Sequence, residues 1–335
     1  MSTVLILGAN GHFGRATTLA FAAAGWQVRA HLRRAPRGPL PAGVAVVQAD
    51  ALDLAALASA AEGCELIVNG LNPDYTRWAS LLPPITAATV ALAERSGATL
   101  LMPGNVYNFG HALPAVLRED TPFVPDHPKA AQRIALEATL AEAARARGVR
   151  SIVLRAGDFL GDAGTWLDLG MGRALPCGRF LQMGPADLPH AWAWLPDLAR
   201  TAVAVAERRA ALPAHAVLHA EGLTLTGAGF QRAFDAAWQA RGGAPLTEGR
   251  FPWWLLQIGA ALPGRPGAMP RALLEMRHLW QRPHRLAEDR LAALIGPVPH
   301  TPLAEVMRAC IDALPPGLRA GLDAGARPAA ASLGS

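Results

Sequence analysis

The chain is poor in three residue types that often carry chemistry: it has three cysteines, two tyrosines and one lysine among 335 residues. Cys64, Cys177 and Cys310 are far apart and show none of the short spacings of zinc sites or disulfide frameworks. We therefore expect reduced thiols, no metal site and a cytoplasmic location.

Long apolar runs and long basic runs are also missing. No stretch of about 18 apolar residues is uninterrupted, so the sequence predicts no membrane-spanning helix and we expect no membrane partner. The formal net charge is +5 and rests almost wholly on arginine. Because no basic stripe with interleaved aromatics accompanies it, we expect no nucleic-acid partner. With 51% hydrophobic residues, the chain can bury a large core in one large or two moderate domains.

A glycine-rich turn near the N-terminus is the strongest positive signal. Four apolar residues, Val4 to Leu7, predict a buried strand, and a helix-forming run follows from Arg15 to Ala24. Glycines between them let backbone N–H groups approach a ligand, and the helix directs its positive end at an anion. The turn therefore predicts a dinucleotide site. Its candidate cofactor-binding residues are Gly8, Asn10, Gly11, His12, Phe13 and Gly14.

Strand and helix signals alternate through the first half of the chain. Such alternation predicts an α/β fold of the Rossmann type, with a doubly wound parallel sheet and ligands at the carboxyl ends of the strands. The predicted strands are Val4–Leu7, Gln27–Leu32, Val44–Gln48, Leu66–Asn69, Thr99–Met102 and Ser151–Leu154. The predicted helices are Gly11–Ala24, Leu54–Glu62, Trp78–Ser96 and Pro128–Arg147.

The pattern loosens after Arg155. Residues 161–189 are rich in Gly, Pro and Trp and predict loops over a site, whereas Val217–His219 indicates a strand. We expect a cofactor-binding domain over residues 1–155, a smaller, mostly helical substrate region over 156–320 packed partly on the sheet, and a tail over 321–335. The predicted helices are Leu198–Arg209, Gly229–Ala240, Trp253–Leu262, Arg271–Trp280, Leu286–Leu294 and Leu303–Leu314.

Two arginines follow the second predicted strand, where this fold places the adenosine ribose. An acidic residue there would bind the ribose 2′-hydroxyl, whereas Arg33 and Arg34 can pair with a 2′-phosphate. The sequence therefore favours NADP(H) over NAD(H), the alternative being two solvated arginines. Asp50 ends the third strand and is placed to meet the adenine amino group, while Asp53 is the better cap for the next helix.

The fourth predicted strand ends in a second glycine-containing segment. Gly70 would let the backbone pass close to the cofactor, and Asn72 could enter the cleft beyond it. Asn69, Gly70 and Leu71 are accordingly candidate cofactor-binding residues, and Asn72 is a candidate substrate-binding residue.

Taken together, these features resemble the extended short-chain dehydrogenase/reductases, the group that includes nucleotide-sugar epimerases and dehydratases. The resemblance covers nearly the whole chain. It rests on the Gly8–Gly14 turn, Asp50, the Leu100–Gly110 strand and loop with Val106 and Tyr107, the helix from Pro128, Leu154 with Arg155, and the Ala193–Ala199 segment. It implies a nicotinamide cofactor and a small-molecule substrate, but no particular reaction.

The sequence departs from this family's reaction centre, which uses a tyrosine, a lysine four residues later and a serine. Alignment through Glu137 puts Lys129 at the tyrosine place and Arg133 at the lysine place, and Pro103 falls near the serine place. The spacing of four keeps Lys129 and Arg133 on one helix face. The tyrosine-dependent mechanism is therefore absent as written.

Lys129 has two interpretations. A desolvated lysine beside a second cation would exchange a proton more readily, which suits an acid/base and is similar to the isoflavone-reductase and NmrA-like branches. The other interpretation is a cofactor anchor or surface cap. Because every other cation except histidine is an arginine, we favour a functional role.

The resulting prediction is an NADP-dependent oxidoreductase acting on a small carbonyl, imine or activated alkene. Two alternatives stay open: a nucleotide-sugar epimerase or dehydratase, and a non-catalytic protein that senses NADP. Tyr107 and Asn105 are further catalytic candidates. The remaining candidate substrate-binding residues are Asp158, Phe159, His190 and Trp194. The Ala-rich helix from Ala130 to Ala146 would permit a homodimer, and the oligomeric state stays open.

Overall fold

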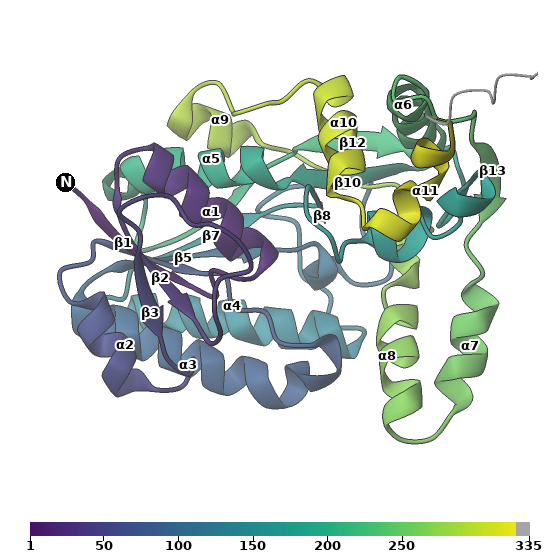
Figure 1. The fold of residues 1–335 in the computed structure, drawn as a ribbon. Helices are drawn as coiled ribbons and strands as arrows, with labels where there is room; N and C mark the ends of the chain where they lie inside the picture. The colour runs from purple at the N-terminus through teal and green to yellow at the C-terminus, as the bar shows by residue number, and fades with distance from the viewer. Residues whose placement is uncertain (326–335) are drawn as a thin grey trace, which may run out of the picture.

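A seven-stranded parallel sheet forms the centre of the protein in the computed structural model, which describes residues 1–325 (Figure 1). Its order is β11-β7-β5-β4-β1-β2-β3, and every neighbouring pair is parallel. The strands are β1 Thr3–Leu7, β2 Gln27–Leu32, β3 Ala45–Gln48, β4 Leu66–Asn69, β5 Thr99–Gly104, β7 Ser151–Arg155 and β11 His215–His219. This confirms the predicted Rossmann-type fold class.

The sheet reverses its direction of growth between β1 and β4. The chain builds outward from β1 to β2 and β3, then crosses back to pair β4 with the other side of β1, with Leu7 opposite Asn69. Ligands of doubly wound sheets bind at such a point, outside the carboxyl ends of the strands. The glycine turn follows β1 and Gly70 follows β4, so both lie at this crevice.

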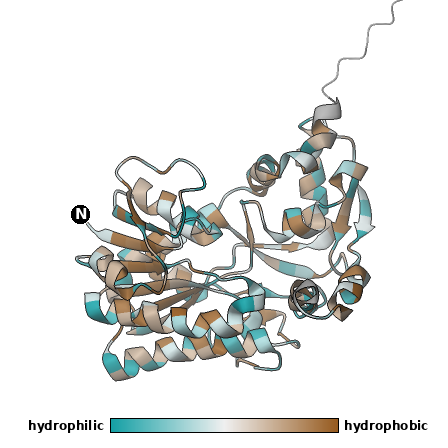
Figure 2. Cartoon of the chain, turned by 60° about the horizontal axis from the view of Figure 1, so that its bottom comes forward, coloured by the Kyte–Doolittle hydropathy of each residue, from teal (hydrophilic) through white to brown (hydrophobic). Residues whose placement is uncertain are grey.

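Helices cover both faces of the sheet (Figure 1). One face carries α1 His12–Ala23 and α5 Leu195–Glu207, and the other carries α2 Leu54–Ala61, α3 Trp78–Ser96 and α4 Pro128–Arg147. Figure 2 shows hydrophobic residues along the strands between these layers, with polar stretches on the outer faces of the helices. The apolar runs of β1 and β4 are thus explained by a sheet whose central strands are buried on both sides.

The second half of the chain adds helices and three small sheets, ordered β12-β10-β8, β13-β9 and β14-β6. The first two of these sheets border a core of their own that is rich in Trp, Phe and Met, whereas the third pairs β14 with β6 of the first half, and its Leu117 and Leu286 belong to a core of the central sheet. The strands of these three sheets are β6 Val116–Leu117, β8 Asp158–Leu160, β9 Arg179–Gln182, β10 Pro189–Trp194, β12 Leu223–Thr226, β13 Thr247–Arg250 and β14 Arg285–Leu286. The further α-helices of the second half are α6 Gly227–Gln239, α7 Trp253–Ala261, α8 Arg265–Leu274, α9 Asp289–Ile295, α10 Leu303–Ala313 and α11 Pro316–Gly325.

Short 3-10 and π turns complete the described chain. They are η1 Tyr75–Arg77, η2 Tyr107–Phe109, η3 Leu167–Met171, η4 Leu175–Cys177, η5 Arg209–Ala211 and η6 Arg277–Trp280.

One predicted helix is wrong in its extent. Instead of running from Arg271 to Trp280, α8 ends at Leu274 and the chain continues as the 3-10 helix η6. The His278 imidazole Nδ1 bonds the Glu275 carbonyl oxygen at 2.8 Å and so takes the acceptor that an α-helix would need.

Two segments do not follow the expected division of the chain into a cofactor-binding domain, a substrate region and a tail. Val217–His219 belongs to β11 at the edge of the central sheet, so the second half returns to the first. Residues 321–325 of the expected tail belong to α11, and residues 326–335 lie outside the described residues.

Candidate functional site

The glycine turn leaves no room for side chains at its closest contacts. A Cβ atom on Gly14 would lie 2.3 Å from the Gly8 carbonyl oxygen, and one on Gly70 would lie 3.0 Å from the Gly14 Cα atom. Gly8 itself has φ of +74°, a conformation that favours glycine. The three glycines therefore let the first turn of α1, the end of β1 and the end of β4 pack backbone on backbone.

The N-terminus of α1 offers its amides to a ligand. The helix begins with the Arg15 N–H donating to the Gly11 carbonyl at 2.8 Å, and no side chain caps it. The N–H groups of the first turn, at His12, Phe13 and Gly14, then point out of the helix end with its positive dipole. This cradle fits the diphosphate of a dinucleotide, as the glycine spacing predicts.

A buried histidine supports the turn from below. The Gly8 N–H donates to His31 Nδ1 at 3.3 Å, while His31 Nε2 bonds the Ala49 carbonyl at 3.1 Å. This pairing requires a neutral ring with its proton on Nε2, and burial lowers the pKa of His31 accordingly. His31 thus fastens the glycine turn to the ends of β2 and β3. No motif in the sequence identifies this role.

The arginines after β2 are free to meet a phosphate. Both Arg33 and Arg34 are exposed. The Asn10 side-chain amide donates to the Ala35 carbonyl at 2.9 Å, and its oxygen accepts from the Arg37 N–H at 3.0 Å. Asn10 therefore ties the arginine-bearing loop to the glycine turn, which keeps both beside the crevice.

The neighbouring acidic and amide residues are placed at the same edge. The exposed Asp50 accepts from the Leu52 N–H at 2.9 Å, and Asp53 caps α2 by accepting from the Ala56 N–H at 3.1 Å. Asn69 is buried and accepts from the Leu71 N–H at 3.1 Å, whereas Asn72 is exposed. Asp50 thus uses its Oδ1 atom in a local turn, and its Oδ2 atom takes no part in that hydrogen bond.

Lys129 and Arg133 lie on the buried face of α4. The helix begins at Pro128, and its N-cap residue His127 accepts from the Ala130 N–H. Arg133 donates to the Pro103 carbonyl at 2.9 Å, at the carboxyl end of β5. The spacing of four therefore does place both cations on one buried face of α4, and Arg133 contacts the end of a strand.

The only lysine of the chain is enclosed by aromatic rings and one carboxylate. Its Nζ donates to Glu275 Oε2 at 2.9 Å, and the side chains of Lys129 and Glu275 are 5% and 31% exposed. The ring centres of Tyr75 and Trp78 lie 5.7 and 6.0 Å from Nζ. Lys129 is thus shielded from water on most sides, and Glu275 is its route to solvent.

The two tyrosines of the chain meet next to this lysine. The hydroxyl groups of Tyr75 and Tyr107 are 3.1 Å apart, and either could donate to the other. Burial is the main cause that holds the pKa of Tyr107 well above its usual value, followed by the adjacent Tyr75 and Asp158. Burial raises the pKa of Tyr75 as well. Both phenols therefore stay protonated and act as hydrogen-bond donors rather than bases.

The loop that carries Tyr107 is fixed by a buried ion pair. Arg155, fully buried at the end of β7, donates to Glu137 of α4 at 2.6 Å and to the Asn105 carbonyl. The Asn105 side-chain oxygen accepts from the Tyr107 N–H at 3.1 Å. Glu137 and Arg155 thus have a structural task, and Asn105 orders the turn that presents Tyr107.

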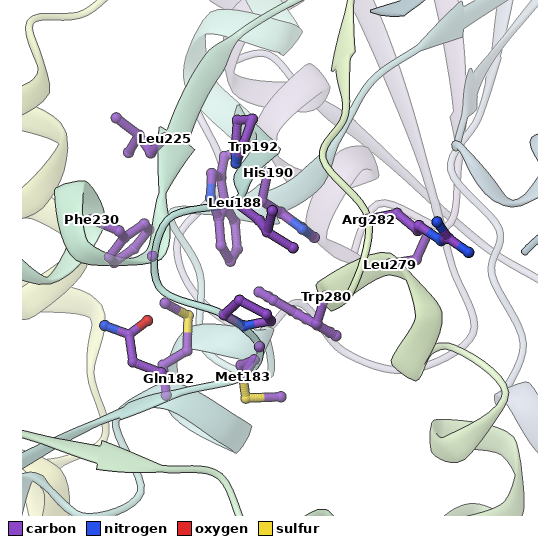
Figure 3. Close-up of a pocket in the computed structure, with 15 residues that line it drawn as sticks. Gln182, Met183, Leu188, His190, Trp192, Leu225, Phe230, Leu279, Trp280 and Arg282 are labelled. Atoms are coloured by element: carbon purple, nitrogen blue, oxygen red, sulfur yellow. The ribbon is translucent and has the colours of Figure 1, made fainter. Parts of the chain in front are cut away.

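The candidate substrate residues gather on β8 and β10. His190 Nε2 bonds Asp158 at 2.9 Å, and the His190 ring stacks on Trp280 with centroids 4.2 Å apart. Figure 3 shows His190 between Trp192 and Trp280 at the wall of a cavity. The volume of this cavity is about 20 Å³, which is room for a single water. Because Asp158 also raises the pKa of Tyr107, this pair lies within electrostatic reach of the tyrosines.

Two other candidates lie closer to the glycine turn. Phe159 stacks on Phe13 with centroids 6.5 Å apart, and the Trp194 ring packs against Gly161. The loop after β8 reaches the same turn, since Asp162 bonds His12 at 3.0 Å. The hydrogen bond from His12 is the main cause that lowers the pKa of Asp162. The second half of the chain therefore closes over the N-terminus of α1.

Sequence reasoning missed three members of the Lys129 centre: Tyr75, Trp78 and Glu275. They are distant from Lys129 in the sequence, Glu275 by 146 residues, and no local motif joins them. The scarcity of tyrosine could have flagged Tyr75, because it is one of only two. Within residues 1–325, no group of three or more His, Cys, Asp or Glu residues could hold a metal ion.

Comparisons with known proteins agree with this geometry. Residues 8–166 match a family model described as NAD(P)H-binding. A search of curated proteins found no match. The matched segment contains the glycine turn, both arginines, Lys129 and Asp158, whereas Glu275, the carboxylate partner of Lys129, lies outside it.

Solved structures share the whole fold at low sequence identity. A putative epimerase from Burkholderia cenocepacia J2315 is 17% identical, with 95% of this chain and 98% of that one covered and a TM-score of 0.70. The Bordetella bronchiseptica enzyme WbmH, solved with NAD+, is 16% identical, with coverages of 93% and 98% and a TM-score of 0.69. TunA, an NAD-dependent NDP-hexosamine 5,6-dehydratase, is 18% identical, with coverages of 93% and 97% and a TM-score of 0.68.

Proposed function

We propose that this chain, which has the fold of the epimerase/dehydratase type of short-chain dehydrogenase/reductase and an NAD(P)H-binding match over residues 8–166, is an NADP-dependent oxidoreductase. Its substrate is a small carbonyl, imine or activated alkene. Lys129 is the acid/base. The observation that carries the proposal is the enclosure of Lys129 by Tyr75, Trp78 and Glu275, with the Tyr107 hydroxyl bonded to that of Tyr75.

The cofactor preference rests on charge at the end of β2. When bound, the reduced nicotinamide supplies the hydride. The backbone amides at the start of α1 hold the diphosphate, and Arg33 and Arg34 pair with the 2′-phosphate. Asn10 keeps that loop against the turn, which supports simultaneous engagement of both phosphate sites.

The proton follows a separate route through the side chains. As hydride reaches the electrophilic carbon, negative charge develops on the substrate oxygen or nitrogen, and the phenol O–H groups of Tyr75 and Tyr107 stabilise it. Lys129 transfers its proton to that atom, so the reduced product leaves neutral. Glu275, one third exposed, then returns a proton from solvent to the lysine amine.

A panel of small ketones, aldehydes, imines and activated alkenes tests the proposal, with NADPH oxidation at 340 nm and product identification as readouts. We expect turnover of at least one class. Glu275→Gln should lower kcat by about tenfold, because it keeps a hydrogen-bonding group but removes the proton carrier. Glu248→Gln, an exposed position on β13, is the control. Absence of turnover with firm NADPH binding would instead indicate cofactor sensing.

A nucleotide-sugar epimerase or dehydratase is the second candidate. The observation that favours it is the fold similarity of nearly the whole chain to a putative epimerase, to an enzyme solved with NAD+ and to an NAD-dependent dehydratase. Lysine at the tyrosine place argues against it. Conversion of a UDP-hexose without net change of cofactor absorbance would replace the oxidoreductase proposal by this one.

A further inference from the structure

A helical hairpin formed by α7 and α8 extends away from the rest of the second half (Figure 1). Its two helices pack against each other, and a Cβ atom on Gly259 would lie 3.1 Å from the Pro270 ring. Arg271 donates to the carbonyls of Ala260 and Leu262 at 2.7 and 3.0 Å, which closes the turn between the helices. The hairpin is therefore a built element with a covered inner side.

The outer side of α7 exposes large apolar residues. Trp254, Leu255, Ile258 and Leu262 are 58%, 50%, 60% and 49% exposed. At 100° per residue their positions fall within a stripe roughly 100° wide, so they form one continuous face. Elsewhere in the described chain, exposed large hydrophobic residues stand singly or as one adjacent pair. A concentrated patch of this kind marks an interaction surface.

The charge of the hairpin selects the kind of partner. Residues 253–274, which hold the two helices, contain Arg265 and Arg271 but no aspartate or glutamate, and the exposed Glu248 and Arg250 of β13 precede them. Arg250 and Arg271 are exposed, and Arg271 donates to main-chain carbonyls rather than to a carboxylate. A second copy of this chain would bring like charges together across the patch. A surface that combines anionic groups with an apolar layer complements both the positive charge and the apolar face.

We propose that the α7–α8 hairpin docks on anionic phospholipid bilayers. Trp254, Leu255 and Ile258 enter the interface between headgroups and acyl chains, where tryptophan is favoured, and the exposed Arg250 and Arg271 meet the lipid phosphates. With nine residues, α7 is about 14 Å long and cannot span the hydrocarbon core. Docking is therefore peripheral.

This proposal revises the expectation of no membrane partner, which rested on the absence of a long apolar run. No helix of residues 1–325 is long and apolar enough to cross a membrane. That criterion does not address a short helix lying on the surface. The docking site also borders the proposed reaction centre, because Glu275 directly follows α8 and pairs with Lys129. Docking itself does not depend on the proposed reaction.

Vesicle co-sedimentation of the full chain, without cofactor, tests the docking surface. We expect binding to vesicles of phosphatidylcholine with 30% phosphatidylglycerol and at least tenfold weaker binding to pure phosphatidylcholine. Raising NaCl from 50 to 500 mM should weaken it further. The double variant Trp254→Glu/Ile258→Glu should lose at least tenfold in partition coefficient. Leu19→Glu, at an exposed apolar position of α1, should bind like the unaltered chain.

Three results would overturn the proposal. They are failure to bind anionic vesicles, equal binding to neutral and anionic vesicles, and equal binding by the double variant and the unaltered chain. Sedimentation equilibrium of the same proteins tests the competing occupant. A dimer that Trp254→Glu/Ile258→Glu dissociates, with no vesicle binding, would assign the patch to a second copy instead. Loss of NADPH turnover has no bearing on these readouts, so the two proposals fail separately.

Discussion

The glycine turn and the Lys129 centre are assembled in opposite ways. The turn is built almost wholly from consecutive residues, Gly8 to Gly14, with Gly70 as its one distant member. The lysine centre joins Tyr75, Tyr107, Lys129 and Glu275, which come from four separate segments. The turn acts through backbone amides and packing, whereas the centre acts through side chains.

With the proposed function, this difference predicts that cofactor binding and chemistry can be altered independently. A change in the turn acts on backbone geometry and should remove the cofactor together with all activity. A change in the centre should leave the cofactor in place and alter the rate. The predictions that follow test this division, beginning with the largest expected effect.

Gly14→Ala should abolish stabilisation by NADPH. Its Cβ would lie 2.3 Å from the Gly8 carbonyl oxygen, so α1 must shift away from β1. We expect a stability loss of about 1–3 kcal/mol from overpacking, and no rise in the thermal midpoint on adding NADPH. Gly317→Ala on α11, where an added Cβ meets nothing within 4 Å, is the control and should respond normally to NADPH. A normal NADPH response from Gly14→Ala would contradict the packing argument.

Tyr107→Phe should lower kcat by about 10²-fold with little change in the Kd for NADPH. It removes a donor to the developing charge but keeps the ring among its neighbours. Tyr75→Phe should act in the same direction. Because both phenol pKa values lie above the usual 10.0, no change in rate from phenol ionisation is expected between pH 8 and 10. An unchanged kcat in both variants would exclude the tyrosines from the reaction.

The double variant Arg33→Ser/Arg34→Ser should reduce the preference for NADPH over NADH by about 10- to 100-fold, the worth of a lost bidentate phosphate contact. Arg37→Ser, an exposed arginine of the same loop, is the matched control. Isothermal titration with both cofactors measures the ratio. If the double variant keeps the preference, the two arginines are merely solvated.

Acidification should destabilise the folded chain. Burial is the main cause that lowers the pKa of His278 to about 4 and those of His219 and His284 to about 3. Below pH 6.5 the folded state therefore binds fewer protons than the unfolded state. As the pH is lowered, the free energy of unfolding decreases by up to about 1.4 kcal/mol per pH unit for each histidine. Urea unfolding at pH 7, 6 and 5 measures the trend. Greater stability at pH 5 than at pH 7 would contradict it.

The same contrast decides what the sequence could predict. The bounds of β2, α3 and α4 follow from local periodicity and breakers, and the structure has them as predicted. The glycine cradle is equally local. Lys129 was identified through spacing and rarity, although its contact with Glu275 depends on where the end of α8 lies against the first half of the chain.

Non-local packing is the reason why other features escaped sequence analysis. β11 joins the central sheet only by pairing with β7, and three residues of alternating pattern could not specify that partner. Tyr75 becomes informative only beside Tyr107, and His31 only beneath Gly8. Neither Tyr75 nor His31 belongs to a local motif, and each acquires its role from a segment elsewhere in the chain.

Lys129→Met offers the most direct test, with NADPH binding and turnover measured on the same sample. The substitution keeps the length of the side chain among Tyr75 and Trp78 but removes the proton donor. We predict an NADPH-induced rise in thermal midpoint within about 1 °C of that of the unaltered chain, together with a fall in kcat of about 10²- to 10⁴-fold. Retained turnover, or the joint loss of cofactor binding and turnover, would contradict the assignment of Lys129 as the acid/base.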